Sequence, residues 1–126
     1  MNAKIVLICD DEEGMRRYLK KMLEAAGLAV ETFACGASLL RRIEGGSPGD
    51  AGLLLQDMML PDTDGISILK RVRELRPALP VVLMTAYANG EAAAAARTGG
   101  ACDFLSKPFT REAILEVIRS TVGPAG

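Results

Sequence analysis

Acidic residues at the ends of two apolar segments are the strongest candidates for chemistry in this chain. Residues 4–9 run into Asp10 and Asp11, and the apolar run that begins at Leu53 ends at Asp57. A carboxylate at the end of a buried strand costs free energy unless a partner uses its charge. Three carboxylates held close together repel one another, and a divalent cation between them would offset that repulsion. Because no histidine joins this set of oxygen ligands, Mg²⁺ is the metal that it suits best.

Two further apolar segments also end beside a polar side chain. The run 80–85 ends at Thr85, and the short run 101–105 precedes Lys107. An ammonium group can hold a phosphoryl oxygen, and a hydroxyl group can donate a hydrogen bond to one. If these groups meet the carboxylates, the set suits the transfer of a phosphoryl group to Asp57.

Composition narrows the classes of function. The 126 residues carry a net charge of -1 and only 4% aromatic residues, which indicates one soluble domain without a nucleic-acid-binding surface. The absence of histidine excludes Ser-His-Asp and Cys-His catalysis and a phosphohistidine role. The cysteines form no C-x-x-C pair, and we expect Cys9 and Cys102 to be buried as small apolar groups because they lie in apolar segments. No apolar run is long enough to cross a bilayer and no signal peptide is apparent, so we expect a cytoplasmic protein.

The chain alternates between apolar segments typical of buried strands and amphipathic segments typical of helices. We expect strands over 4–9, 28–33, 53–57, 80–85 and 101–105, and helices over 12–26, 36–44, 66–75, 90–98 and 111–121. This alternation predicts an α/β domain with a five-stranded parallel sheet, doubly wound so that helices cover both faces. Ligands bind such sheets beyond the carboxyl ends of the strands, which is where the candidate residues lie.

Three helices carry more specific signals. Spacing predicts that Ile66, Leu69, Val72 and Leu75 form the buried face of one helix, and Thr110 is expected to cap the last helix. The segment 90–98 is nearly all alanine, so it has high helix propensity but few bulky side chains. We therefore expect it to be the least firmly packed helix.

Four motifs, taken together and in this order, make the chain resemble the receiver domains of two-component response regulators. They are Asp10-Asp11, Asp57 with Pro61 and Asp64-Gly65, Thr85-Ala86, and Lys107-Pro108-Phe109. The resemblance covers essentially the whole chain and implies a flavodoxin-like (βα)5 fold with strand order 2-1-3-4-5. It implies a receiver domain over 1–121, with a tail or the start of a linker over 122–126. The segment 85–109 is most similar to receivers of sigma-54-dependent activators of the nitrogen-regulator type.

By this resemblance, Asp57 is the residue that a histidine kinase phosphorylates. Asp11, Asp57 and the backbone carbonyl of Met59 would bind Mg²⁺, and Asp10 would assist through a water molecule. Lys107 would pair with the phosphoryl group. Met59 and Tyr87 would flank the phosphoryl group. Both side chains are bulky and neither orients water well, so we expect slow loss of the phosphate.

The resemblance also implies a switch and its partners. Thr85 would bind a phosphoryl oxygen while Phe104 turns inward, and the bond from Lys107 to Pro108 would be cis. The output surface would comprise 90–98, 101–105 and the last helix, and phosphorylation would favour a weak homodimer through it. An ATPase and a DNA-binding domain would follow if the chain is part of a longer regulator of transcription. The receiver itself would touch neither nucleic acid nor membrane, and it would be a signalling protein rather than an enzyme.

Blander interpretations and two other classes of function remain open. Asp10 and Asp11 could serve simply as a cap of the first helix, and Lys107 could be a solvated surface lysine. An aspartyl phosphatase would use a D-x-D motif, but Met59 stands where its general acid would be. The other class is an interaction module that works without phosphorylation, a receiver whose acidic site has decayed. It would take up no phosphate, but every expected site residue is present here.

Overall fold

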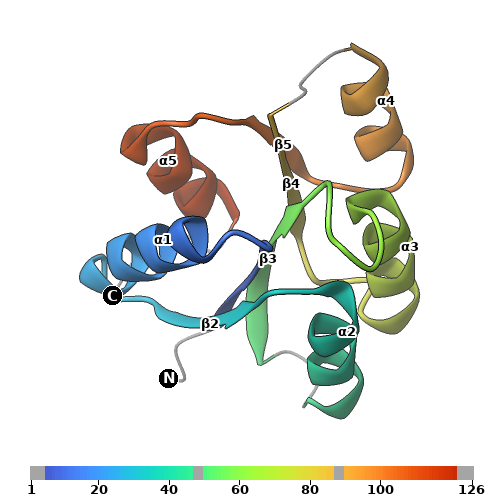
Figure 1. Cartoon of the computed structure of the whole chain (residues 1–126), viewed down its shortest axis with the longest axis horizontal. Coiled ribbons are helices and arrows are strands. Elements are labelled where there is room, and N and C mark those ends of the chain that lie inside the picture. Colours follow the sequence, from blue (N-terminus) through green and yellow to red (C-terminus); the bar gives the residue numbers. More distant parts are fainter. Residues whose placement is uncertain (1–4, 47–49, 87–89, 122–126) are drawn as a thin grey trace.

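The computed structural model describes residues 5–46, 50–86 and 90–121, in which strands and helices alternate along the chain (Figure 1). Its strands are β1 (Ile5–Cys9), β2 (Ala29–Phe33), β3 (Ala51–Asp57), β4 (Val81–Thr85) and β5 (Asp103–Ser106). Its helices are α1 (Glu13–Ala25), α2 (Gly36–Gly45), α3 (Gly65–Leu75), α4 (Gly90–Thr98) and α5 (Arg111–Thr121). Every predicted element is present. The expected tail over 122–126 lies outside the described residues.

The parallel sheet has the order β2-β1-β3-β4-β5, as predicted. Helices α1 and α5 lie on one face of the sheet, and α2, α3 and α4 lie on the other (Figure 1). From β1 the chain adds β2 on one side of the sheet, and it then adds β3, β4 and β5 in turn on the other side. The order of strands therefore reverses between β1 and β3. The carboxyl ends of these two strands therefore flank the crevice in which doubly wound sheets bind ligands.

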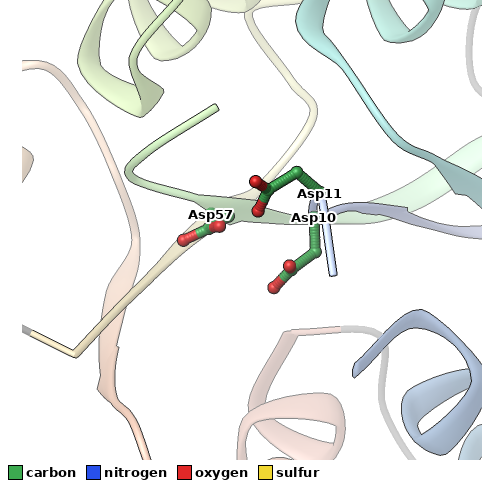
Figure 2. A group of neighbouring side chains, drawn as sticks. All are labelled: Asp10, Asp11 and Asp57. Atoms are coloured by element: carbon green, nitrogen blue, oxygen red, sulfur yellow. The ribbon is translucent and has the colours of Figure 1, made fainter. Parts of the chain in front are cut away.

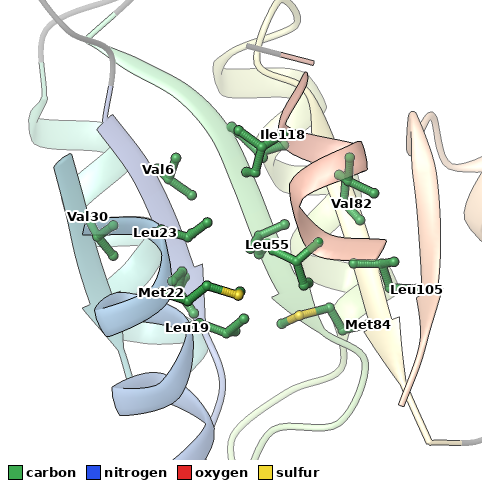
Figure 3. Packing of buried hydrophobic residues seen from close by; sticks show 14 residues of the cluster. Val6, Leu19, Met22, Leu23, Val30, Leu55, Val82, Met84, Leu105 and Ile118 are labelled. Carbon is green, nitrogen blue, oxygen red and sulfur yellow. The ribbon is translucent and has the colours of Figure 1, made fainter. Parts of the chain in front are cut away.

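Apolar side chains form one cluster on each face of the sheet, because alternate residues of a strand point to opposite faces. On the face of α1 and α5, Val6 and Leu55 of the sheet pack with Leu19 and Ile118 of the helices (Figure 3). The opposite cluster includes Leu7, Leu39, Leu54, Ile68, Leu69 and Leu83. The central strands are thus buried on both sides, and the polar groups at their ends stand on a rigid base.

The beginning of β5 corrects one prediction from sequence. The strand begins at Asp103 rather than at residue 101, because Ala101 and Cys102 still belong to the connection from α4. Cys102 is consequently exposed, so the expectation that it would be buried is wrong. Cys9 lies within β1 and is buried as predicted, and burial raises the pKa of its thiol to about 12.

The cap of α5 agrees with its prediction, and the buried face of α3 agrees in part, since Leu69 and Val72 are buried. Thr110 accepts a hydrogen bond from the backbone N–H of Ala113 and so caps α5 as expected. In α3 the fully buried side chains include Ile68, whereas Ile66 and Leu75 are only partly buried. A spacing of three residues drifts around a helix of 3.6 residues per turn, which explains this error.

Helix α4 is the least firmly packed, as its composition predicts. Ala96 is the one buried residue among the α4 side chains that the structure describes. Gly100, with φ of +94°, ends the α4 segment. Among the described helices, none combines the length and the apolar character needed to cross a membrane.

Candidate functional site

Three carboxylates meet at the carboxyl ends of the central strands. Asp10 directly follows β1 and Asp57 is the last residue of β3, and Asp11 projects beside them (Figure 2). One carboxylate oxygen of each residue lies within 4.8 Å of those of the other two. Asp10 is fully buried and Asp57 is 7% exposed, whereas Asp11 is exposed. The site therefore has a buried floor of two acids and a third acid at its open edge.

Lys107 contributes the positive charge of the site. Its Nζ atom lies 2.8 Å from Oδ2 of Asp10 and 3.5 Å from Oδ1 of Asp57. Its backbone N–H donates a hydrogen bond to the carbonyl of Thr85, and the peptide bond to Pro108 is cis, as expected. The side chain is 12% exposed, so the bland interpretation as a solvated surface lysine is wrong.

Hydrogen bonds of Asp10 also bear on the helix-cap interpretation. Oδ1 of Asp10 accepts a hydrogen bond from the backbone N–H of Glu12, and Oδ2 accepts one from Lys107. Glu12 occupies the N-cap position of α1 without making a side-chain cap. Capping α1 therefore does not account for the acid pair, because half of the Asp10 carboxylate faces the candidate site.

Electrostatics shift the pKa of two groups in the site. Burial raises the pKa of Asp57, and the charge of Asp10 raises it further; Lys107 and the backbone N–H of Met59 oppose this shift without cancelling it. Burial lowers the pKa of Lys107, but its hydrogen bond and attraction to Asp10 outweigh burial, so the net shift is upward. The site thus places three carboxyl groups around one ammonium group.

These residues fit a divalent cation of the Mg²⁺ type. All candidate ligands are carboxylate oxygens, without imidazole or thiolate, which is the donor chemistry that Mg²⁺ prefers. A divalent charge at this point would also relieve the repulsion that raises the pKa of Asp57. The acidic cluster can therefore bind a metal.

The predicted switch residues lie on neighbouring strands. Thr85 ends β4, is 4% exposed and is paired in register with Ser106, while Phe104 is paired with Leu83. Because side chains repeat every second residue along a strand, Thr85 and Phe104 face the same side of the sheet. Phe104 is partly buried against the cluster beneath α2, α3 and α4. This placement permits the two side chains to compete for shared space.

The loop after Asp57 is held close to the acceptor by backbone contacts. Gly65 donates a hydrogen bond of 2.7 Å from its N–H to the carbonyl of Met58. A Cβ atom on Gly65 would lie 2.8 Å from the backbone oxygen of Asp57, so only glycine fits without a shift. The Met59 side chain, at 63% exposed, lies on the open side of the loop. Tyr87, the other residue expected beside the phosphoryl group, lies outside the described residues.

Three residues around the site were not among those predicted from the sequence. Arg16 donates a hydrogen bond of 2.8 Å from Nη1 to the carbonyl of Asp10, and the buried Gln56 donates one of 3.0 Å from Nε2 to the carbonyl of Asp57. Asp62 binds the beginning of α2. A buried glutamine directly before the acceptor was a usable signal. The other two contacts join residues whose proximity only the fold creates.

Comparisons with known proteins agree with this geometry. The family model for the response regulator receiver domain matches residues 6–119. NtrC of Escherichia coli K12, a DNA-binding transcriptional regulator, is 34% identical over 122 residues, which cover 97% of this chain and 25% of that protein. The chain thus spans a quarter of the length of this relative.

Solved structures have the same fold. A CheY-like receiver domain protein from Methanospirillum hungatei JF-1 superposes with a TM-score of 0.88 at 31% identity, covering 94% of this chain and 93% of that one. A response regulator from Burkholderia pseudomallei, solved with a phosphorylated aspartic acid and a calcium ion, superposes with a TM-score of 0.81 at 28% identity. The match covers 89% of this chain and 64% of that one. With acids and a lysine at the strand ends, this fold and these relatives, the chain belongs to the receiver domain family of two-component response regulators.

Proposed function

We propose that Asp57 accepts a phosphoryl group from the phosphohistidine of a sensor histidine kinase, in a reaction that requires Mg²⁺. The observation that carries the proposal is the convergence of Asp10, Asp11, Asp57 and Lys107 at one edge of the sheet. The phosphorylated aspartic acid of the Burkholderia pseudomallei regulator supports it by analogy.

The transfer itself needs only one nucleophile from this chain. A carboxylate oxygen of Asp57 attacks phosphorus, a P–O bond forms, and the P–N bond to the kinase imidazole breaks. The imidazole nitrogen keeps the electron pair of that bond and takes a proton from water. Asp57 must be ionised to attack, and a divalent cation beside it would favour the ionised form.

Lys107 and the acids have different roles in this scheme. Asp11, Asp57 and the Met59 carbonyl would hold Mg²⁺, with Asp10 assisting through water, and the metal would neutralise charge on the transferring phosphoryl group. The Lys107 ammonium, which lies between Asp10 and Asp57, would move its hydrogen bond to a phosphoryl oxygen. The hydrogen bond to Asp10 would hold the Lys107 ammonium beside Asp57 before phosphorylation.

The signal would leave the site through Thr85. A phosphoryl group on Asp57 would attract the Thr85 hydroxyl, and Phe104 would turn into the vacated space. The affected surface is formed by α4, β5 and α5, through which we expect a weak homodimer. Because NtrC extends well beyond the matched region, we propose that an ATPase or DNA-binding output domain receives the signal in the complete regulator. The receiver would work in the cytoplasm, would contact no DNA itself, and would lose its phosphate slowly.

The test is the intact mass after incubation with acetyl phosphate, with and without Mg²⁺. We expect one phosphate adduct on the wild-type protein, and no adduct without the metal or in the Asp57→Asn variant. Absence of an adduct under all conditions would overturn the proposal and favour an interaction module that works without phosphorylation.

A further inference from the structure

Asp62 joins two elements that the sequence keeps apart. Its Oδ1 atom accepts a hydrogen bond of 3.0 Å from the N–H of Gly36, and its Oδ2 atom accepts one of 2.9 Å from the N–H of Ala37. These are the first two residues of α2, where free N–H groups attract negative charge. The two bonds lower the pKa of Asp62, so the carboxylate stays charged over the working pH range.

Helix α2 has no side-chain cap from its own N-cap residue. Cys35 occupies that position with φ of −149° and ψ of 164°, a conformation suited to a capping side chain, but its thiol makes no cap bond. Asp62 therefore supplies from a distance the cap that an aspartate at position 35 would supply locally. The connection fixes the position of α2 relative to another loop, which a local cap would not do.

That other loop carries the phosphoacceptor. It runs from Asp57 to α3 and is closed on itself by a hydrogen bond of 3.1 Å from the Leu60 N–H to the Thr63 carbonyl. Its outer side lies against α2, because a Cβ atom on Gly36 would come 2.6 Å from Cγ2 of Thr63. The carboxylate of Asp62, which is part of this loop, therefore connects the loop to α2.

We propose that Asp62 is a positioning residue for the phosphoryl-transfer site, holding the loop from Met58 to Asp64 against α2 so that the Met59 carbonyl faces the metal. The inference rests on the proposed function, since the metal and the acceptor are those proposed above. Asp62 touches neither of them. Its effect passes through the loop backbone, in the way that outer-shell groups orient the ligands of a metal.

The role predicts a specific loss in the Asp62→Ala variant. We expect Mg²⁺ to bind about tenfold more weakly, which is at the low end of the effects seen when an outer-shell partner is removed. The phosphorylation rate with acetyl phosphate should return close to the wild-type rate once Mg²⁺ saturates the site. Titration calorimetry gives the affinity, and intact mass against time gives the rate.

A double variant separates positioning from simple stabilisation of α2. Adding Cys35→Asp to Asp62→Ala gives α2 a local cap and preserves the net charge, but it does not reconnect the loop. We expect this double variant to regain thermal stability in EDTA while Mg²⁺ affinity stays low. Recovery of both quantities would overturn the inference, because Asp62 would then act only by stabilising the helix.

Asp50→Asn is the matched control. It weakens the ion pair of Asp50 with Arg42 on the far half of α2 and leaves the bonds of Asp62 intact. We expect the affinity for Mg²⁺ to remain at the wild-type value in this variant, and a comparable loss would contradict a role specific to Asp62. If the wild-type protein neither binds Mg²⁺ nor takes up phosphate, the proposed function fails. If it does both and Asp62→Ala binds Mg²⁺ normally, only the inference about Asp62 fails.

Discussion

The ammonium of Lys107 is hydrogen-bonded to the fully buried carboxylate of Asp10, with 2.8 Å between Nζ and Oδ2. The two residues are separated by 97 positions in the chain, so only the parallel sheet brings them together. Lys107 is thereby oriented toward Asp57 before any phosphate arrives. The same contact makes the lysine part of the stability of the unphosphorylated protein.

Replacing Lys107 with alanine is expected to destabilise the metal-free protein by about 3 kcal/mol, because it leaves a buried carboxylate without its partner. Mg²⁺ should restore part of this loss by neutralising the same acids. Urea unfolding in EDTA and in Mg²⁺ measures both effects. Lys20→Ala, which removes an exposed ion pair with Glu24, should change stability by less than about 1 kcal/mol in either buffer. Equal effects of the two substitutions would mean that the buried contact of Lys107 with Asp10 stabilises the protein no more than an exposed ion pair does.

Substitution of Asp57 by asparagine should stabilise the metal-free protein at neutral pH, by about 1 kcal/mol, because it removes a buried charge repelled by Asp10. The raised pKa means that the folded protein binds the Asp57 proton more tightly than the unfolded chain does. The penalty from Asp57 is therefore present above its folded pKa and disappears as the pH falls below the pKa of the unfolded chain. Thermal unfolding of both proteins between neutral pH and about pH 4 should show the difference shrink. A difference independent of pH would rule out this cause.

Gly65→Ala is expected to destabilise the protein by about 2 kcal/mol and to slow phosphorylation, because the new methyl group would push against the backbone at Asp57 and Met58. At Gly14, within α1, an added methyl group would have nothing within 4 Å. Gly14→Ala should therefore raise stability, by about 0.5–1 kcal/mol, through helix propensity alone. Chemical denaturation and the initial rate of adduct formation compare the two variants. A wild-type rate of phosphorylation in Gly65→Ala would mean that the close approach of Gly65 to the backbone of Asp57 does not matter for the reaction.

Loss of the phosphate should become faster in a Met59→Asn variant. The methionine side chain cannot orient an attacking water molecule, whereas an amide on the same exposed position can form a hydrogen bond with one. We expect the lifetime of the adduct to shorten by about tenfold, at the low end of the effect of a positioned polar group on a reacting water molecule. The decay of the adduct after removal of acetyl phosphate measures this directly. An unchanged lifetime would mean that Met59 does not control access of water.

The fold and the central site could be predicted from sequence because both depend on local patterns. Apolar runs that end at Asp10, Asp57 and Thr85 already fix which side chains reach the carboxyl edge of a parallel sheet. Lys107 follows from its place just after the last strand. The strand order and the cis bond before Pro108 came from the resemblance to receivers and are confirmed.

Other features could not be predicted, for physical reasons. The cap that Asp62 gives to Gly36 joins residues 26 positions apart, and a turn-forming aspartate looks the same whether or not it binds another helix. The exposure of Cys102 depends on where β5 begins, and strand boundaries are weakly encoded in a short apolar segment. Burial of Ile68 instead of Ile66 depends on how α3 is rotated against the sheet, which neighbouring helices decide.

The position of the phosphate on the chain shows whether Asp57 is the phosphoacceptor. After incubation with acetyl phosphate and Mg²⁺, reduction with borohydride converts a phosphorylated aspartate to homoserine, and peptide mass spectrometry identifies its position. We expect homoserine at position 57 alone, in proportion to the adduct seen in the intact protein. Homoserine at position 10 or 11, or a stable adduct that borohydride does not reduce, would contradict Asp57 as the phosphoacceptor.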